Sequence, residues 1–250
     1  MEESRLREAA EIIIDSKYLV ALTGAGISKE SNIPTFRGED GLWRTYDAMQ
    51  LATPGAFANN PSLVWEWYSW RQGIIADCHP NPAHETLSNW EQEGILRCLI
   101  TQNVDGLHRR AGSKNVLEVH GDIWALKCTS CTYKGRLDKP ASGILECPSC
   151  MNHLRPDVVW FGEALDQDIV GKLYTQLTKS DVCIIIGTSG LVYPAASFPL
   201  VVKQHGGSLI EVNIEKTVLS GKVDIHLPGK AGDVLPALDL LMHDDARRNR

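Results

Sequence analysis

The chain has 250 residues, of which 43% are hydrophobic and 22% charged, and its formal net charge is −6 at pH 7. This composition is ordinary for a globular protein with a buried core, and the acidic balance argues against nucleic-acid binding, which needs a basic surface. The sequence contains neither an apolar run of about 18 residues nor an apolar stretch behind its first residues, so we expect no membrane partner, no signal peptide and a cytoplasmic location.

The chain opens with a strand that leads into a glycine-rich loop. Residues 2–15 predict an amphipathic helix, and residues 18–22 predict a buried parallel strand. The strand runs into Thr23–Gly26, the start of a dinucleotide-binding loop, where glycines let the backbone approach a pyrophosphate. Lys29 stands where the third glycine is expected, and no acidic strand end follows about 20 residues later, so a plain βα turn stays open.

The next segment does not predict regular structure. Residues 32–43 are rich in Gly and Pro but contain Phe36 and Trp43, a pattern that favours a lid that orders over a ligand. Arg37 in this segment either contacts phosphates or is a solvated loop arginine.

Two helices follow the lid segment. Residues 61–77 predict a helix with an aromatic stripe, which is typical of a core, and residues 82–93 predict a second helix that ends before Gly94. Tyr68 and Arg71 are three residues apart, so they share one helix face, where they could bind a carboxylate. The alternative is that Arg71 extends into solvent.

Polar side chains then gather at the ends of two predicted strands. Residues 98–100 lead into Asn103 and Asp105, and residues 116–119 lead into His120. Ligands of open α/β folds bind at the carboxyl ends of strands, so we expect these three side chains to face one bound molecule. Histidine suits general-base catalysis near neutral pH, and His120 is favoured over His108.

Four of the seven cysteines form a metal-binding pattern, Cys128-x2-Cys131 and Cys147-x2-Cys150. Two such pairs at this separation predict one tetrahedral zinc ion held by four thiolates. A site of this kind is closed to water and substrate, so its predicted role is structural. Catalytic zinc and a redox dithiol are minor alternatives.

The remaining sequence alternates strands and helices. Helices are predicted at 166–179, 194–204 and 231–242, and strands at 182–186, 208–212 and 225–227. Parallel strands therefore end in polar or small-residue loops at Gly24, Gln102, Gly187 and Asn213, a repetition that favours a nucleotide site.

The predicted fold class is α/β, with a Rossmann-like parallel sheet and a smaller zinc-binding lobe formed by two insertions. The large lobe would comprise approximately 1–27, 81–120 and 159–250, the small lobe 28–80 and 121–158, with the ligand cleft between them.

Several motifs carry a family resemblance across nearly the whole chain. They are GAGIS at 24–28, IPTFRG at 33–38, TQNVDGLH at 101–108, VHG at 119–121, the CxxC pairs, VVWFGE at 158–163 and GTS at 187–189. With these motifs the chain resembles the sirtuins, NAD-dependent protein-lysine deacylases of the Sir2 family. The segment Ala52–Pro54 and the Tyr68-x-x-Arg71 pair are similar to the desuccinylase type.

The resemblance implies roles for particular residues. His120 would be the general base, with one structural zinc ion in the small lobe. Tyr68 and Arg71 would bind an acyl carboxylate, and the peptide would add as a strand to Val158, Val159, Trp160, Phe161 and 190–192. Phe36 would cover the ribose once nicotinamide has left. The implied NAD contacts are Gly24, Ala25, Gly26, Thr35, Phe36, Arg37, Gln102, Asn103, Asp105, Gly187, Thr188, Ser189, Asn213 and Ala231.

The expected activity is NAD-dependent removal of acetyl and succinyl or malonyl groups from lysine. The products would be nicotinamide and O-acyl-ADP-ribose, and the partners acyl-lysine peptides or proteins, bound by a monomer. Two other classes stay open: a protein ADP-ribosyltransferase that uses the same NAD site, and a non-catalytic NAD-binding and zinc-binding interaction module.

Overall fold

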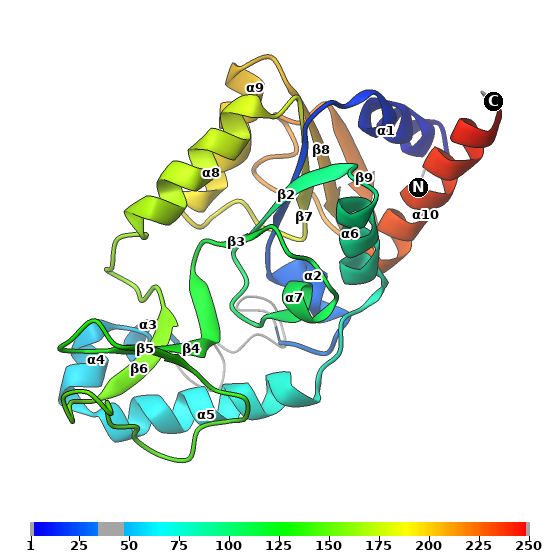
Figure 1. Cartoon of the computed structure of the whole chain (residues 1–250). Helices are drawn as coiled ribbons and strands as arrows, with labels where there is room; N and C mark the ends of the chain where they lie inside the picture. Colours follow the sequence, from blue (N-terminus) through cyan, green and yellow to red (C-terminus); the bar gives the residue numbers. More distant parts are fainter. Residues whose placement is uncertain (1–2, 35–47, 249–250) are drawn as a thin grey trace.

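A computed structural model of the chain describes residues 3–34 and 48–248. A parallel sheet flanked by helices forms one lobe, and a small antiparallel sheet with a long helix forms the other (Figure 1). This arrangement confirms the predicted fold class. No helix among the described residues is long and apolar enough to cross a membrane.

The large sheet has the strand order β3-β2-β1-β7-β8-β9, and its neighbouring strands all pair in parallel. The strands are β1 (Leu19–Thr23), β2 (Leu96–Thr101), β3 (Val116–Glu118), β7 (Val182–Ile186), β8 (Ser208–Asn213) and β9 (Ile225–Pro228). Every residue of the central strands β1 and β7 is buried, because helices cover both faces of the sheet.

Two hydrophobic cores hold these helices to the sheet. One core joins it to α1 (Glu3–Asp15), α6 (Pro82–Gln92) and α10 (Ala231–Arg248), through side chains such as Leu87 and Leu235. The core on the opposite face joins it to α8 (Gln167–Lys179) and α9 (Phe198–Gln204), through side chains such as Leu173 and Phe198. The two groups of helices lie on opposite sides of the sheet in Figure 1.

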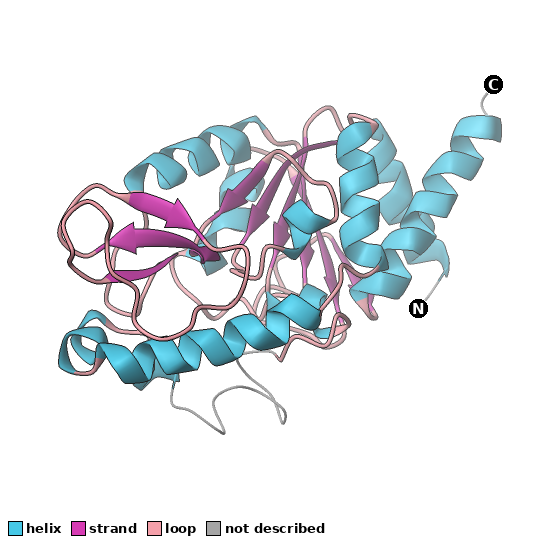
Figure 2. Ribbon diagram, turned by 60° about the horizontal axis from the view of Figure 1, so that its bottom comes forward, coloured by secondary structure: helices cyan, strands magenta, loops and turns pink. Residues whose placement is uncertain are grey.

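The small lobe has its own sheet and its own core. Strands β4 (Gly121–Cys128), β5 (Lys134–Arg136) and β6 (Leu154–Val158) pair antiparallel in the order β5-β4-β6. Helices α3 (Ala48–Leu51), α4 (Pro54–Asn59) and α5 (Pro61–Asp77) accompany them (Figure 2). Trp65 fastens α5 to this sheet, since its indole Nε1 donates to the carbonyl of Leu154 at 2.9 Å.

Short elements complete the described chain: α2 (Ala25–Lys29), α7 (Leu107–Arg110) and the 3₁₀ turn η2 (Ala195–Ser197). The predicted helix at 194–204 is two elements, η2 and α9, so that prediction was wrong in detail. Pro199 has no N–H to donate to the preceding turn, and the α-helical hydrogen bonds therefore begin only after it.

Candidate active site

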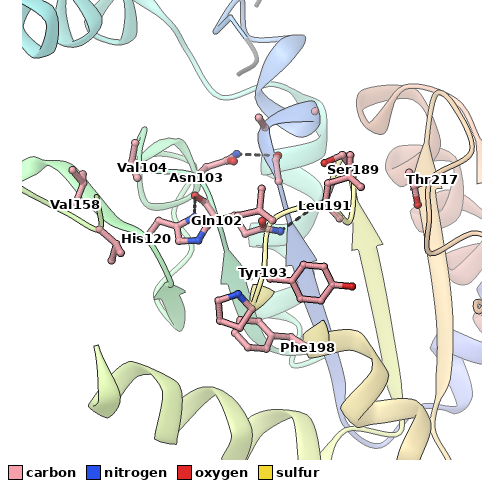
Figure 3. Close-up of a pocket in the computed structure, with 18 of the residues that line it drawn as sticks. Gln102, Asn103, Val104, His120, Val158, Ser189, Leu191, Tyr193, Phe198 and Thr217 are labelled. Carbon is pink, nitrogen blue, oxygen red and sulfur yellow. Dashed lines mark hydrogen bonds between the residues drawn. The ribbon is translucent and has the colours of Figure 1, made fainter. Parts of the chain in front are cut away.

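A cavity of about 1990 Å³ lies at the carboxyl ends of the large sheet's strands. Strand β1 pairs with β2 on one edge and with β7 on the other. From β1 the chain continues to β2 and β3 in one direction of the sheet, and from β7 to β8 and β9 in the other. The loops after β1 and β7 therefore meet at the point where the strand order reverses. The cavity continues into the small lobe, where residues of α5 and of the segment after β6 line it. Figure 3 shows Val158 at one side of the site and Ser189 and Thr217 at the other, with His120 and Gln102 between them.

The glycines of the first loop bring two strand ends into contact. Gly26 N donates to Gly187 O at 2.7 Å, and a Cβ on Gly26 would lie 2.7 Å from Gly187 Cα. A Cβ on Gly24 would lie 2.8 Å from Thr188 Cβ. Gly187 itself has φ +60°, a backbone conformation that favours glycine. Packing between the loops therefore requires glycine here, while Gly24, Ala25 and Gly26 also line the cavity.

Asn103 lies on the cavity wall in front of a buried polar network. Its amide Nδ2 donates to Gly24 O and to Ser28 Oγ, both at 3.1 Å. Ser28 Oγ donates to Asp105 Oδ2 at 2.9 Å, and Leu107 N donates to the other carboxylate oxygen at 2.9 Å. Burial raises the pKa of Asp105, opposed by these two hydrogen bonds. Asn103 lines the cavity, whereas Asp105 lies behind it and holds Ser28 in place.

His120 faces the middle of the cavity immediately after β3. Its Nδ1 lies 3.0 Å from the carbonyl oxygen of Gln102. A carbonyl oxygen only accepts, so Nδ1 carries the proton and Nε2 has a free lone pair. Burial lowers the pKa of His120 below its usual value of 6.5, although the Gln102 carbonyl opposes this shift, and the ring is therefore neutral at pH 7.

His108, the other candidate base, occupies a different environment. Its side chain is 2% exposed, and its Nε2 lies 2.9 Å from Thr23 Oγ1. Its ring packs 4.7 Å from that of His84, and burial holds the pKa of His108 well below its usual value. His108 is not among the residues that line the cavity, so the geometry favours His120.

Tyr68 and Arg71 line the small-lobe end of the cavity from α5. Arg71 is only 8% exposed, which excludes the alternative that it extends into solvent. Its guanidinium carbon lies 4.9 Å from the centre of the Trp67 ring, and burial lowers its pKa. The Tyr68 hydroxyl accepts a hydrogen bond from Trp160 Nε1 at 2.8 Å.

The segment after β6 already uses three successive N–H groups. Val159 N donates to His120 O, Trp160 N to a carboxylate oxygen of Glu163 and Phe161 N to Ala52 O, each at 2.9 Å. A peptide strand that adds to this segment therefore has to bond to its carbonyl oxygens. Val158, Val159, Trp160 and Phe161 all line the cavity.

The other end of the cavity is built from the loops after β7, β8 and β9. Gln102 Nε2 donates to Thr188 Oγ1 at 3.1 Å, and Asn213 Nδ2 donates to Thr188 O at 2.9 Å. Gly187, Ser189 and Ala231 line the same end. Thr35, Phe36 and Arg37, which the sequence assigns to the cofactor loop, lie outside the described residues.

The four cysteines of the two CxxC pairs come together in the small lobe. Their sulfur atoms all lie within 4.8 Å of one another, with 3.4 Å between Cys128 and Cys150 and 3.6 Å between Cys131 and Cys147. Four thiolates at a zinc–sulfur distance of about 2.3 Å stand about 3.8 Å apart in a tetrahedron, so the set fits one zinc ion.

Sequence reasoning missed two parts of the site. Ser28, the last residue of the GAGIS motif, joins Asn103 to Asp105, and its place one turn after the glycines was the only sequence signal. Residues 214–218, which follow Asn213, line the far end of the cavity without any motif that pointed to them.

Comparison with known proteins gives the family. A family model described as Sir2 family matches residues 24–194. The NAD-dependent protein deacylase of Pyrococcus furiosus is 51% identical over 240 residues, covering 93% of this chain and 96% of that protein. NAD-dependent protein deacylase 1 of Archaeoglobus fulgidus is 48% identical over 240 residues, covering 95% and 96%.

Solved structures agree with the sequence comparison. A mutant Sir2 homologue in complex with ADP-ribose matches with a TM-score of 0.94 at 45% identity, covering 99% of this chain and 98% of that one. A Sir2 homologue–NAD complex matches with a TM-score of 0.92 at 47% identity, covering 95% and 94%. Sir2Af2 bound to a myristoylated histone peptide matches with a TM-score of 0.81 at 33% identity over all of both chains. Given the matching motifs, fold and cavity, this chain belongs to the Sir2 family.

Proposed function

We propose that this protein is an NAD-dependent protein-lysine deacylase, which acts as a cytoplasmic monomer on acyl-lysine peptides or proteins. The observation that carries the proposal is the position of His120: a neutral imidazole with a free Nε2, midway along a cavity that joins the glycine loops to the small lobe. The relatives named as NAD-dependent protein deacylases and the Sir2 complex with an acylated histone peptide support this assignment.

The cavity suits an extended dinucleotide. We assign Asn213, Ser189 and Ala231 to the adenosine half, the backbone of Gly24–Gly26 to the phosphates, and Gln102 and Asn103 to the nicotinamide ribose and nicotinamide. Asp105 supports Asn103 through Ser28. The donor set fits NAD because backbone and amide groups converge on one continuous space, and the loops that hold them are fixed by their mutual packing.

NAD bound in this cavity would supply a ribose carbon to which the acyl oxygen bonds as the bond to nicotinamide breaks. One water molecule is then consumed in breaking the acyl–nitrogen bond, and the products are free lysine, nicotinamide and O-acyl-ADP-ribose. His120 Nε2 is placed to hold a proton that would come from a ribose hydroxyl, so that this oxygen could bond to the acyl carbon. The Gln102 carbonyl holds the ring in the required tautomer. The walls at the small-lobe end of the cavity, including Trp160 and Val104, would screen the ribose carbon from water while nicotinamide leaves.

We further propose that the enzyme removes succinyl or malonyl groups as well as acetyl groups. Tyr68 and Arg71 present a hydroxyl and a buried guanidinium to the small-lobe end of the cavity, where the distal part of an acyl group would lie. Ala52 lines the same end, and its small side chain leaves room for a longer acyl group. A guanidinium pairs with a carboxylate through two parallel hydrogen bonds, which an acetyl group cannot use.

The test compares kcat/KM for one peptide that carries acetyl-lysine or succinyl-lysine, with and without NAD. We expect Arg71→Met to lower kcat/KM for the succinyl peptide by about 10- to 100-fold more than for the acetyl peptide, because a hydrogen-bonded charge pair is lost. Equal losses for both peptides would refute the carboxylate role. Mass spectrometry of the acceptor separates loss of an acyl group from gain of ADP-ribose, which would indicate an ADP-ribosyltransferase instead.

A further inference from the structure

The carboxylate of Glu211 is buried beside the adenosine end of the cavity but belongs to none of the roles above. Glu211 lies on β8, paired in register with Ile185 of β7 and His226 of β9, and is 0% exposed. Burial of a carboxylate in a sheet is costly unless hydrogen bonds and charge compensate for lost water. Its partners therefore indicate what the group does.

Three side chains satisfy this carboxylate, and two of them belong to one loop. Thr217 Oγ1 donates to Oε1 at 2.5 Å, Ser220 Oγ donates to Oε2, and His226 Nδ1 donates to Oε2 at 2.9 Å. The two hydroxyl groups also accept from the backbone of the same loop, from Leu219 N at 3.0 Å and from Thr217 N at 2.8 Å. Through these hydrogen bonds, Glu211 connects the loop to strand β8.

This loop, residues 214–224, is the connection between β8 and β9, and it consists of turns without a helix. Parallel strands are usually joined by a helix that packs on the sheet by itself. In its place, the hydroxyl–carboxylate network holds the connection. Leu219 and Val218 also abut the loop after β7: a Cβ on Gly190 would lie 2.9 Å from Leu219 Cγ and 3.0 Å from Val218 Cγ2.

The same loop forms one wall of the cavity. Residues 214–218 line it, beside Asn213 and opposite the end that contains Val158, and Figure 3 shows Thr217 at this far side. We propose that Glu211 is a positioning residue for the adenosine half of NAD, acting through the loop at 214–220. This inference rests on the proposed function, because it assigns that end of the cavity to adenosine.

The experiment measures binding and kinetics of the full-length, zinc-loaded Glu211→Gln variant. The dissociation constants of NAD and ADP-ribose, measured by calorimetry, should rise about tenfold, equivalent to about 1.4 kcal/mol. The KM for NAD should rise in parallel, while the KM for the acyl-peptide and kcat at saturating NAD stay within about twofold of the unmodified enzyme. A purely structural role would lower the melting temperature without this split between the two substrates.

A matched control is Asp224→Asn. Asp224 accepts from Leu209 N at 2.8 Å and pairs with Lys203, at the opposite end of β8 from the cavity. The same change from carboxylate to amide should cost stability here but leave the NAD dissociation constant unchanged. Thr217→Val removes the bond to Oε1 and also the hydrogen bond that Thr217 Oγ1 accepts from Leu219 N, both within the same network. It should therefore weaken NAD binding in the same direction, and its effect should not add to that of Glu211→Gln. If Glu211→Gln does not fold, Thr217→Val and Ser220→Ala decide the question.

An unchanged NAD dissociation constant in folded Glu211→Gln would overturn the inference. An equal rise of the NAD dissociation constant in Asp224→Asn would also overturn it, as would a lower kcat together with higher KM values for both substrates in Glu211→Gln. These results differ from a failure of the proposed function, in which the unmodified protein itself would bind neither NAD nor ADP-ribose.

Discussion

One backbone carbonyl determines which nitrogen of the His120 ring carries the proton. Imidazole has two nitrogens, and the Gln102 oxygen at 3.0 Å from Nδ1 fixes the proton there, which leaves Nε2 able to accept another. Burial favours the neutral ring, so its pKa lies below 6.5. Both effects support the same state, a base that is competent at neutral pH.

The first prediction concerns this residue. Because the pKa is lowered, His120 is unprotonated at pH 7 and gains a proton only as pH falls, so kcat/KM should be level above pH 7 and drop with a midpoint below 6.5. His120→Asn should lower kcat by about 10²- to 10⁴-fold and remove this acidic limb. Circular dichroism and melting temperature serve as the folding control. A variant that keeps full activity, or an acidic limb above pH 7, would contradict the assignment.

At the scale of elements, the site depends on the contact between the loops that follow β1 and β7. The parallel pairing of β1 with β7 places Thr23 opposite Ile186, so the following residues meet directly. The two loops can approach this closely only with glycine at positions 26 and 187. A Cβ on either residue would come within 2.7 Å of backbone atoms of the other loop. The glycine motif therefore reflects strand packing as well as the proposed contact with a phosphate.

The second prediction tests this packing. Gly26→Ala should lower the free energy of unfolding by about 1–3 kcal/mol, since the two loops must separate, and should also weaken NAD binding. Urea denaturation and calorimetry measure the two effects. Gly73 in α5 is the control, because a Cβ there meets nothing within 4 Å, and Gly73→Ala should stabilise the protein by about 0.5–1 kcal/mol. Equal effects of the two substitutions would show that the loop contact is unimportant.

At the scale of the whole molecule, the cysteine cluster belongs to the same hydrophobic core as residues that line the small-lobe end of the cavity. Cys128 and Cys147 share a hydrophobic core with Tyr68, Ala52 and Trp160. Strand β6 leaves the cysteine module and leads directly into Val158–Phe161, the segment that lines the cavity. A structural zinc ion would therefore stabilise the small-lobe end of the cavity without lining it.

The third prediction is that removal of zinc disorders this end first. Elemental analysis should find one zinc ion per chain, and a chelator or Cys147→Ser should lower the melting temperature by about 10 °C or more, because binding energy of a structural zinc is folding energy. Deacylation should fall with it and return when zinc is added back to the chelated protein. A zinc-free protein with unchanged melting temperature and activity would argue against the structural role.

Much of the fold followed from local patterns. The helix predicted at 61–77 and the strand predicted at 182–186 have the same bounds in the structure, because long aromatic or β-branched runs between clear end signals determine their own conformation. Strand β4 was missed, since residues 122–124 are buried in succession and no alternation of apolar and polar side chains marks this strand in the sequence. The helix predicted at 194–204 is divided between Ser197 and Phe198, directly before Pro199 in the first turn of α9.

The sequence by itself determined the alternation of strands and helices, the zinc-binding spacing of the cysteines and the polar residues at the strand ends. Each of these features can be read from residues that are close together in the chain. The sequence left two questions open that only the tertiary structure decided. Arg71 is buried and faces the cavity because α5 packs against a sheet more than 50 residues away in sequence, through bonds such as that from Gln72 to Ile123 O. Glu211 acts on the cavity only because β8, its loop and His226 converge around one carboxylate, a contact between segments that no local pattern encodes.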